Sequence, residues 1–439
     1  SAHSASTSVT FETPLKLPDY QNQYGQGWDG RFAYADGQGG GVSDDEDASW
    51  GPRLDGRPIP QFFSPITGYA ADGTPIRQPA PWVAHPNNVR DFFETGRTAN
   101  TNVAFATSSE RANVRLSLSR MDLEGMLPGF RMDRTNVSLH GGANVSARLR
   151  TDASLQYINS GGVNRPAQGY GGANPMWAFI WFGRQVDTRL LKQTIHNADG
   201  SQYNWNNIWN NNPYYLAREN RNQDDRDRVM GNASLSYDLT SWLTGTLRAG
   251  TDWFSESRRQ QYGQGLYSMQ VDVGDNGGLG VDNIFRQETN ADFLLRAQLP
   301  SIGGLDVEAD FGGARRDNRY RGDGVWIREL AIPGTYSYTN WIDPPTPWDY
   351  RERQAVNSLY GQARFNYRDF AFLDLSGRND WSSTLPPENN SYFYPAVSGS
   401  LVFSELTQLP LLSFGRLRAG WTRVGNDAPP YQLIDPYNF

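Results

Sequence analysis

The stretch from Val229 to Trp253 alternates apolar and polar side chains with a period of two, and this pattern constrains the fold most strongly. One face carries Val229, Gly231, Ala233, Leu235, Tyr237 and Leu239 and, after a break at Thr240–Trp242, Leu243, Gly245, Leu247, Ala249, Thr251 and Trp253. The other face carries mainly Ser, Thr, Asn and Gly with a few charged residues. The stretch therefore predicts a β-hairpin with one apolar and one polar face.

The character of the polar face favours a membrane barrel over a soluble sandwich. A sandwich would turn long charged side chains toward bulk water, whereas small polar residues suit a crowded, wet lumen. Tyr237 and Trp253 stand at opposite ends of the apolar face, roughly ten residues apart along a strand, which matches a tilted membrane strand with aromatic girdles. A register shift by one residue would move Arg248 toward lipid, at roughly 2–4 kcal/mol near the midplane. We therefore expect one strongly specified register.

Composition supports an all-β chain and excludes several classes of protein. The 439 residues include 45 Gly and 13% aromatic residues, without a long helical period. No apolar run reaches the roughly 18 residues of a membrane helix. The absence of Cys excludes disulfides and thiolate metal sites, and the net charge of -7 argues against nucleic acid as a partner. The N-terminal SAHSASTSVTF has no export signal, so we expect the start of an exported protein to be missing.

Alternating segments recur along the chain, and about thirteen strands can be counted by this pattern. The connections are predicted to alternate strictly between short turns and long loops, as in bacterial barrels, where short turns are periplasmic and long loops extracellular. Two of the predicted loops span 159–227 and 317–353. An odd number of strands leaves two open edges, which lipid does not tolerate, so the chain is expected to be part of a larger barrel.

Several long motifs resemble the SusC/RagA family of TonB-dependent outer-membrane transporters in order and spacing. They are LPDYQNQYGQG (Leu17–Gly27), SWGPRLDG (Ser49–Gly56), NNVRDFFETGRTANTNVAF (Asn87–Phe105), RNDWSSTLPPENNSYFYPAVSGS (Arg378–Ser400) and LSFGRLRAGWTRVGNDAPPYQL (Leu412–Leu433). The resemblance implies a transmembrane antiparallel β-barrel of 22 strands. Residues 1–439 would supply its first part, without the N-terminal plug, the TonB box or the last strands.

The same resemblance implies a place in a Gram-negative outer membrane, in contact with membrane lipids. Family members use the TonB complex, here through the missing N-terminal part, and pair with a SusD-like surface lipoprotein that lids the barrel. They import oligosaccharides or peptides. Two other functions stay open: a membrane-anchored scaffold barrel within a larger assembly, and a passive porin, against which the resemblance speaks.

Aromatic residues crowd the segment from Met176 to Tyr215, and five of them are candidate contacts for substrate or for the lipoprotein lid. These are Trp177, Trp181, Phe182, Trp205 and Trp209. Their flat rings could stack on sugars or pack against a partner. The alternative interpretation is an interfacial girdle with loop self-packing.

No catalytic, phosphate-binding or zinc motif is present, so we predict neither an enzyme nor a cofactor. The four histidines lack ligand spacing. Asp44–Asp47 and the run containing Asp272 and Asp275 have the oxygen-rich, Gly-turned character of a Ca²⁺ loop, but without full ligand spacing a solvated acidic loop is the stronger interpretation. The Arg378–Trp381 motif is interpreted as a structural network ahead of a substrate contact.

Overall fold

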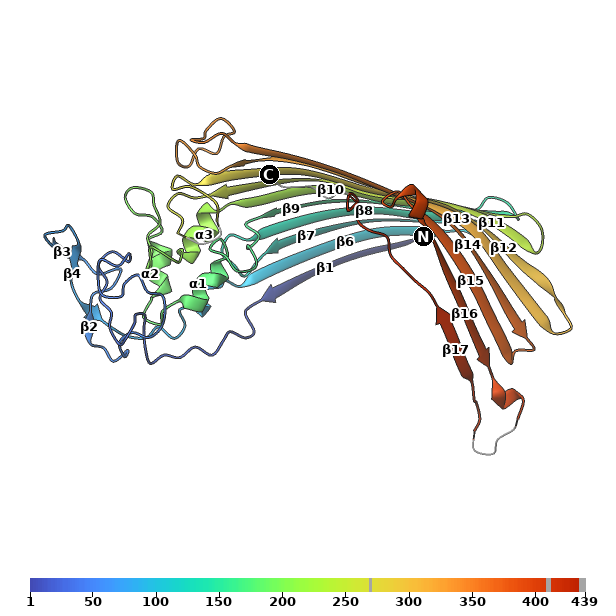
Figure 1. Ribbon diagram of the computed structural model, residues 1–439, viewed down its shortest axis with the longest axis horizontal. Coiled ribbons are helices and arrows are strands. Elements are labelled where there is room, and N and C mark those ends of the chain that lie inside the picture. Colours follow the sequence, from blue (N-terminus) through green and yellow to red (C-terminus); the bar gives the residue numbers. More distant parts are fainter. Residues whose placement is uncertain (268–270, 408–411, 434–439) are drawn as a thin grey trace.

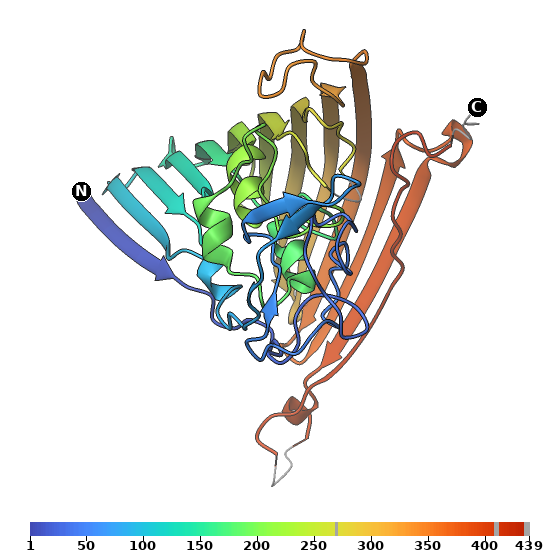
Figure 2. The same ribbon diagram turned by 90° about the vertical axis from the view of Figure 1, so that its left-hand side faces the viewer.

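The computed structural model describes residues 1–267, 271–407 and 412–433. Its dominant element is one 13-stranded antiparallel sheet whose strands follow chain order, from β1 (Ala2–Glu12) at one edge to β17 (Leu417–Thr422) at the other. Figure 1 shows long, curved strands with the large connections gathered at one end, here called the loop end. Figure 2 shows that the sheet bends into an open arc, with the blue and green connections on its concave side.

The strands between these two edges are long and regular. They are β6 (Gly96–Ser108), β7 (Ala112–Glu124), β8 (Arg131–Asn144), β9 (Leu149–Val163), β10 (Asn222–Asp238), β11 (Leu243–Tyr262), β12 (Gly278–Ile302), β13 (Leu305–Ile327), β14 (Thr346–Tyr367), β15 (Ala371–Ser382) and β16 (Ser391–Leu401). Neighbouring strands pair antiparallel throughout, so each backbone polar group inside the sheet meets a partner on the next strand.

The remaining elements belong to the connections. Two small sheets pair β2 (Pro58–Ile59) with β5 (Ala80–Pro81) and β3 (Ile66–Tyr69) with β4 (Pro75–Arg77). The helices are α1 (Pro175–Trp181), α2 (Thr188–Gln193) and α3 (Pro213–Glu219), with 3-10 turns η1 (Arg90–Phe92), η2 (Pro387–Asn389) and η3 (Phe403–Glu405). In the described part of the chain, no helix is long and apolar enough to cross a membrane.

The hairpin predicted around Thr240–Trp242 is confirmed as β10 and β11. Val229 lies opposite Trp253 and Leu235 lies opposite Leu247, so the two predicted apolar sets share one face. The predicted total of thirteen strands in the main sheet is also confirmed. Side-chain alternation therefore identified this hairpin and the residues that share each of its faces.

The apolar face of the sheet is uncovered, which excludes a soluble sandwich. Leu235, Leu247 and Leu373 are 43%, 60% and 40% exposed. Arg165, from the long connection on the concave side, forms an ion pair with Asp224 of the polar face. The polar face is therefore concave and the apolar face convex, as in a barrel whose outside meets hydrocarbon.

Several strands extend farther toward the loop end than side-chain alternation predicted. β10 begins at Asn222 rather than Val229, and β12 begins at Gly278 rather than Ala291. The predicted loop 317–353 was wrong over much of its length, because β13 continues to Ile327 and β14 begins at Thr346. Beyond the hydrocarbon both faces meet water, so the apolar alternation ends while backbone pairing continues.

The predicted strict alternation of connection lengths was also wrong at two places. The connection from β7 to β8, Gly125–Phe130, is short although it lies at the loop end. The connection from β16 to β17, beginning at Val402, is long although it lies at the turn end. Connection length alone therefore does not assign every end of this sheet.

Reversing the polarity of one convex position tests which face meets lipid. We expect Leu247→Arg to destabilise the barrel by roughly 2–4 kcal/mol, because the guanidinium would enter hydrocarbon. The matched change on the concave face, Thr246→Arg, should cost far less because that side chain stays in water. Urea titration of the whole receptor folded in lipid vesicles measures both, and equal losses would contradict the assignment of faces.

Candidate transport surface and the loop domain

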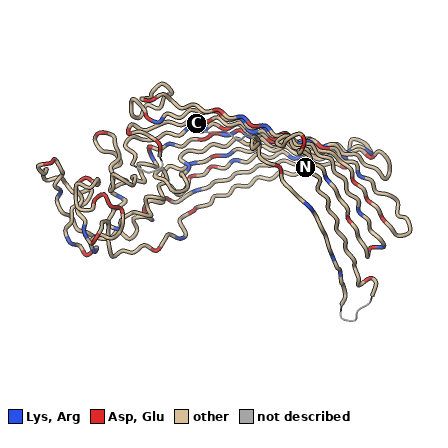
Figure 3. Tube along the Cα trace, in the orientation of Figure 1, with Lys and Arg blue, Asp and Glu red and all other residues tan. Residues whose placement is uncertain are grey.

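Charged side chains on the concave face pair across neighbouring strands. Figure 3 shows that both signs of charge occur along the strands. The pairs include Arg150–Asp238 at 2.7 Å, Arg248–Asp292 at 2.8 Å, Arg296–Asp310 at 2.9 Å and Arg364–Glu308 at 2.8 Å. Exposed pairs contribute little stability each, about 0–1 kcal/mol. Together they form a hydrophilic wall along which a polar solute can remain hydrated.

A cavity of about 400 Å³ opens on this wall near the loop end. Glu256, whose side chain is 6% exposed, lies between Arg226 and Arg258 and forms ion pairs with both. The charged residues around the cavity are Arg134, Arg165, Arg226, Arg258, Asp224 and Glu256. Arginines outnumber carboxylates, so the cavity favours an anionic group such as a carboxylate, which the guanidinium fork can bind with two parallel hydrogen bonds.

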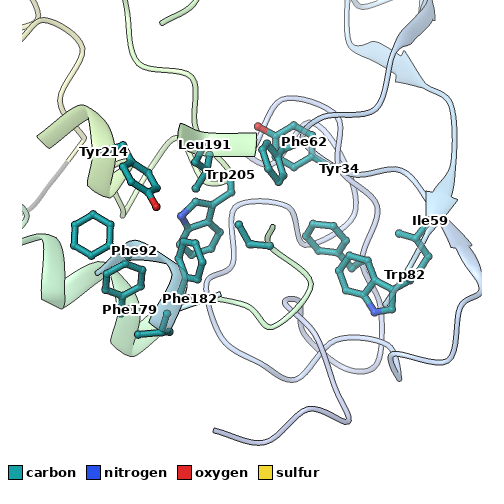
Figure 4. Close-up of a cluster of buried hydrophobic side chains, with 13 residues drawn as sticks. Tyr34, Ile59, Phe62, Trp82, Phe92, Phe179, Phe182, Leu191, Trp205 and Tyr214 are labelled. Carbon is teal, nitrogen blue, oxygen red and sulfur yellow. The ribbon is translucent and has the colours of Figure 1, made fainter. Parts of the chain in front are cut away.

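The two longest connections, 13–95 and 164–221, share one hydrophobic core, and we call this unit the loop domain (Figure 4). Phe92 packs against Phe179 with ring centroids 5.0 Å apart, and Phe182 packs edge-on against Trp205 at 5.2 Å. The buried core residues are Phe32, Tyr34, Ile59, Phe62, Trp82, Val89, Phe92, Phe179, Phe182, Val186, Leu191, Trp205 and Tyr214. Segments far apart in sequence thus form a folded body over the concave face.

The five predicted aromatic contacts occupy different environments in the loop domain. Trp177, Phe182 and Trp205 are buried, Trp181 is half-buried, and Trp209 is 43% exposed. The buried three pack within the loop domain, which leaves their ring faces unavailable to a sugar. A substrate or lid contact stays a prediction for this set, and Trp209 is its accessible member.

Arg184 connects the two halves of the loop domain, and sequence reasoning missed it. The guanidinium is buried, donates to Asn22 Oδ1 at 3.0 Å, and also bonds Asn88 Oδ1 and the Pro86 carbonyl. It also lies over the Tyr20 ring, 4.9 Å from its centroid. Burial lowers the pKa of Arg184. A single arginine in a loop gives no periodic signal, so its partners become visible only in the fold.

Asp44, within the acidic run Asp44–Asp47, organises the Gly-rich segment before it. The fully buried carboxylate accepts hydrogen bonds from five backbone N–H groups. The donors are Ala35, Asp36, Gly37, Gly39 and Gly41, at 2.9 to 3.1 Å. Donors surround the oxygens that a cation would need, so the carboxylate has a structural role. The interpretation of this residue as part of a solvated acidic loop was therefore wrong.

The weaker calcium candidates do not form a cluster. Asp272 pairs with Arg328 at 2.7 Å, and the backbone carbonyl of Asp275 accepts from Gly265 N–H. Among the described residues, no three His, Cys, Asp or Glu side chains are grouped to hold a metal. Calcium binding by Asp272 and Asp275 therefore has no geometric support in the described part of the chain.

The Arg378–Trp381 motif forms a hydrogen-bond network on the concave face, as its interpretation predicted. Arg378 pairs with Asp380 at 2.7 Å and donates to Ser358 Oγ at 2.8 Å. Next to it, the Asp427 carboxylate accepts from Gln354 and Ser382. These interactions hold the segment after β17 against the inner wall.

Removing Arg184 should loosen the loop domain. Arg184→Met would leave the buried Asn88 Oδ1 without this donor, at roughly 1–3 kcal/mol, and would also remove the hydrogen bonds to Asn22 and to the Pro86 carbonyl. We expect limited proteolysis to cleave the loop domain at least tenfold faster, with the β-sheet intact. Arg218→Met is the matched control because that side chain is 65% exposed. Equal cleavage of both variants would contradict the role of Arg184.

The loop domain should also lose stability in acid through Asp187, which caps α2. Hydrogen bonding from the Arg189 guanidinium holds the pKa of Asp187 below its ordinary value of 3.8. A depressed pKa means that this stabilisation is present at neutral pH and is lost as the pH falls through the folded-state value. Tryptophan fluorescence during thermal unfolding should show Asp187→Asn less stable than the unmodified protein near neutrality, with the gap closing below about pH 4. A difference in stability between the two proteins that does not change with pH would contradict this role of Asp187.

Comparison with known proteins finds a similar TonB-dependent receptor and similar transporter structures. No family model matches the chain. TonB-dependent receptor P3 of Formosa agariphila is 21% identical over 366 residues, covering 79% of this chain and 35% of that protein. A structure of the RagAB peptide transporter superposes with a TM-score of 0.59 at 14% identity, covering 76% of this chain and 38% of that chain. The RagAB peptide importer in its open-open state gives 0.55 at 15% identity, covering 75% and 36%.

This chain thus spans little more than a third of the length of each of these proteins. The superposition itself shows a common fold. The matched proteins are named as a receptor and as a transporter. Together the sequence motifs, the curated relative and the shared sheet show that the chain is similar to a TonB-dependent receptor and has the sheet architecture of the RagAB transporter.

Proposed function

We propose that this receptor imports bulky nutrients across the outer membrane, powered through TonB, together with a SusD-like surface lipoprotein. The observation that carries the proposal is the hydrophilic wall of ion pairs on the concave face, covered at the loop end by the loop domain. This arrangement provides a wet route and a folded body at its mouth. It is supported by the match to a TonB-dependent receptor and to structures described as a peptide importer.

In this proposal residues 1–439 contribute part of a larger closed barrel, with the loop end outside the cell and the convex face in lipid. A plug and a TonB box in other parts of the receptor would couple import to the TonB complex. The lipoprotein would sit over the loop domain, where Trp209 offers an exposed aromatic contact. Open strand edges in hydrocarbon are costly, which supports closure with further strands.

Within the proposed substrates, peptides fit the inner wall better than neutral oligosaccharides. The cavity bounded by Arg134, Arg226 and Arg258 has more guanidinium groups than carboxylates. Every peptide with a free C-terminus carries a carboxylate, whereas a neutral sugar chain offers no charge. A bidentate carboxylate contact would orient the peptide near the mouth of the lumen.

Uptake of matched peptides tests this function. Cells producing the whole receptor should accumulate a fluorescent peptide with a free C-terminus, and lose this accumulation when TonB is inactivated. Arg134→Gln should lower uptake of that peptide about tenfold, the order expected for one charge-assisted hydrogen bond, 1.5–3 kcal/mol. The same peptide with an amidated C-terminus should enter poorly both in cells that produce the unmodified receptor and in cells that produce the Arg134→Gln variant.

Two controls make the result specific. Arg120→Gln removes an arginine from the convex face and should leave uptake unchanged. TonB-independent uptake would favour a passive pore, and no uptake of any peptide or oligosaccharide would favour a scaffold barrel. Either outcome would overturn the proposed import.

A further inference from the structure

Arginines occupy the convex face of β13 and β14 immediately beyond its apolar belt. On β13 the convex positions are apolar at Phe311 and Gly313 and become charged from Arg315 toward the loop end. On β14 the corresponding positions run from Leu359 to Arg353. The charged residues on this part of the face are Arg315, Asp317, Arg319, Arg321, Asp323, Asp349, Arg351 and Arg353. Five arginines meet three aspartates in a chain whose net charge is -7.

The arginines are paired with one another across the strands. Arg319 lies directly opposite Arg353, and Arg321 lies directly opposite Arg351. Like charges directly opposite each other destabilise a sheet. Asp317 is shared by Arg315, Arg319 and Arg353, with distances of 3.6, 3.0 and 2.8 Å. One carboxylate cannot neutralise three guanidinium groups, so this surface, here called the arginine patch, favours an additional anion.

An apolar groove of about 680 Å³ leads to the arginine patch. The floor of the groove crosses three neighbouring strands, where Ala249 on β11 lies opposite Ala291 on β12, and Ala291 lies opposite Arg315 on β13. The two alanines form the floor, and the Arg315 guanidinium stands at its end. Larger apolar side chains border the floor, among them Leu247, Phe293 and Leu359. The groove suits a hydrocarbon chain in shape and polarity. The small alanine side chains on its floor leave space for the chain, and the larger apolar side chains at its border contact it.

We propose that the groove and the arginine patch together bind a membrane lipid with a phosphorylated headgroup. Its acyl chain would lie in the groove, and its phosphate would bind Arg315, Arg319 and Arg353. Arginine suits phosphate because its planar fork makes paired, charge-assisted hydrogen bonds. Continuity between an apolar groove in the lipid-facing belt and a cationic surface at its margin indicates a lipid rather than a free anion. The site lies in the outer leaflet if the loop end faces outward, as proposed above.

The binding test uses the purified whole receptor in vesicles of phosphatidylcholine, with or without phosphatidic acid as the phosphorylated probe. We expect phosphatidic acid to raise the thermal unfolding midpoint of the unmodified receptor. Arg319→Gln/Arg353→Gln should lose most of this rise. In phosphatidylcholine alone the same variant should differ little in stability from the unmodified receptor, because it relieves the repulsion of the opposed pair and also removes the two ion pairs to Asp317.

The matched control, Arg286→Gln/Arg316→Gln, removes two concave-face arginines from β12 and β13 and should retain the rise. Ala291→Phe fills the groove while leaving the arginines in place, and should reduce the rise. A full rise in the Arg319→Gln/Arg353→Gln variant, or an equal loss of stability in both vesicle types, would overturn the proposal. The same rise with inorganic phosphate would assign the patch to a free anion and also overturn it. Peptide uptake is scored separately, so a receptor that binds lipid without importing leaves this inference standing.

Discussion

Hydrocarbon offers no partner to a backbone N–H or carbonyl, and this constraint shapes the whole chain. Antiparallel pairing satisfies each group on the next strand, and the same geometry turns successive side chains to opposite faces. The sheet from β1 to β17 therefore separates lipid from water with a single layer. Its convex leucines need no second layer, because the membrane covers them as a core would in a soluble protein.

The part of the fold inside the membrane was predictable because there each side chain has one permitted environment. From Val229 to Trp253 polarity alone specified the register. Beyond the membrane that restriction ends: both faces of the sheet meet water, charged residues such as Asp317 and Arg319 occur on the convex face, and polarity no longer distinguishes strand from loop. The strand extensions follow from pairing with neighbours, which sequence periodicity does not report.

The candidate site was less predictable than the sheet for the same reason. The wall of ion pairs depends on cross-strand neighbours such as Arg248 and Asp292, which follow from register once pairing is known. In the loop domain no strand register relates one residue to its neighbours. Its tryptophans were visible in the sequence, but Trp205 is buried in a core that includes Phe62 and Trp82, which lie more than a hundred residues earlier in the chain. Arg184 and Asp44 are further examples, since each binds backbone or amide groups that carry no sequence pattern.

Arginine acts in two ways on this sheet, and position decides which. On the concave face guanidinium groups such as that of Arg248 pair with carboxylates, whereas on the convex face of β13 and β14 guanidinium groups oppose one another. The shared core of the loop domain has a mechanical consequence as well. This core joins the β1–β6 connection to the β9–β10 connection. A force applied to either connection is therefore transmitted to both strand pairs, β1 and β6 and β9 and β10. Displacing one connection alone would disrupt the packing of that core, so we expect the two connections to move together as one rigid unit.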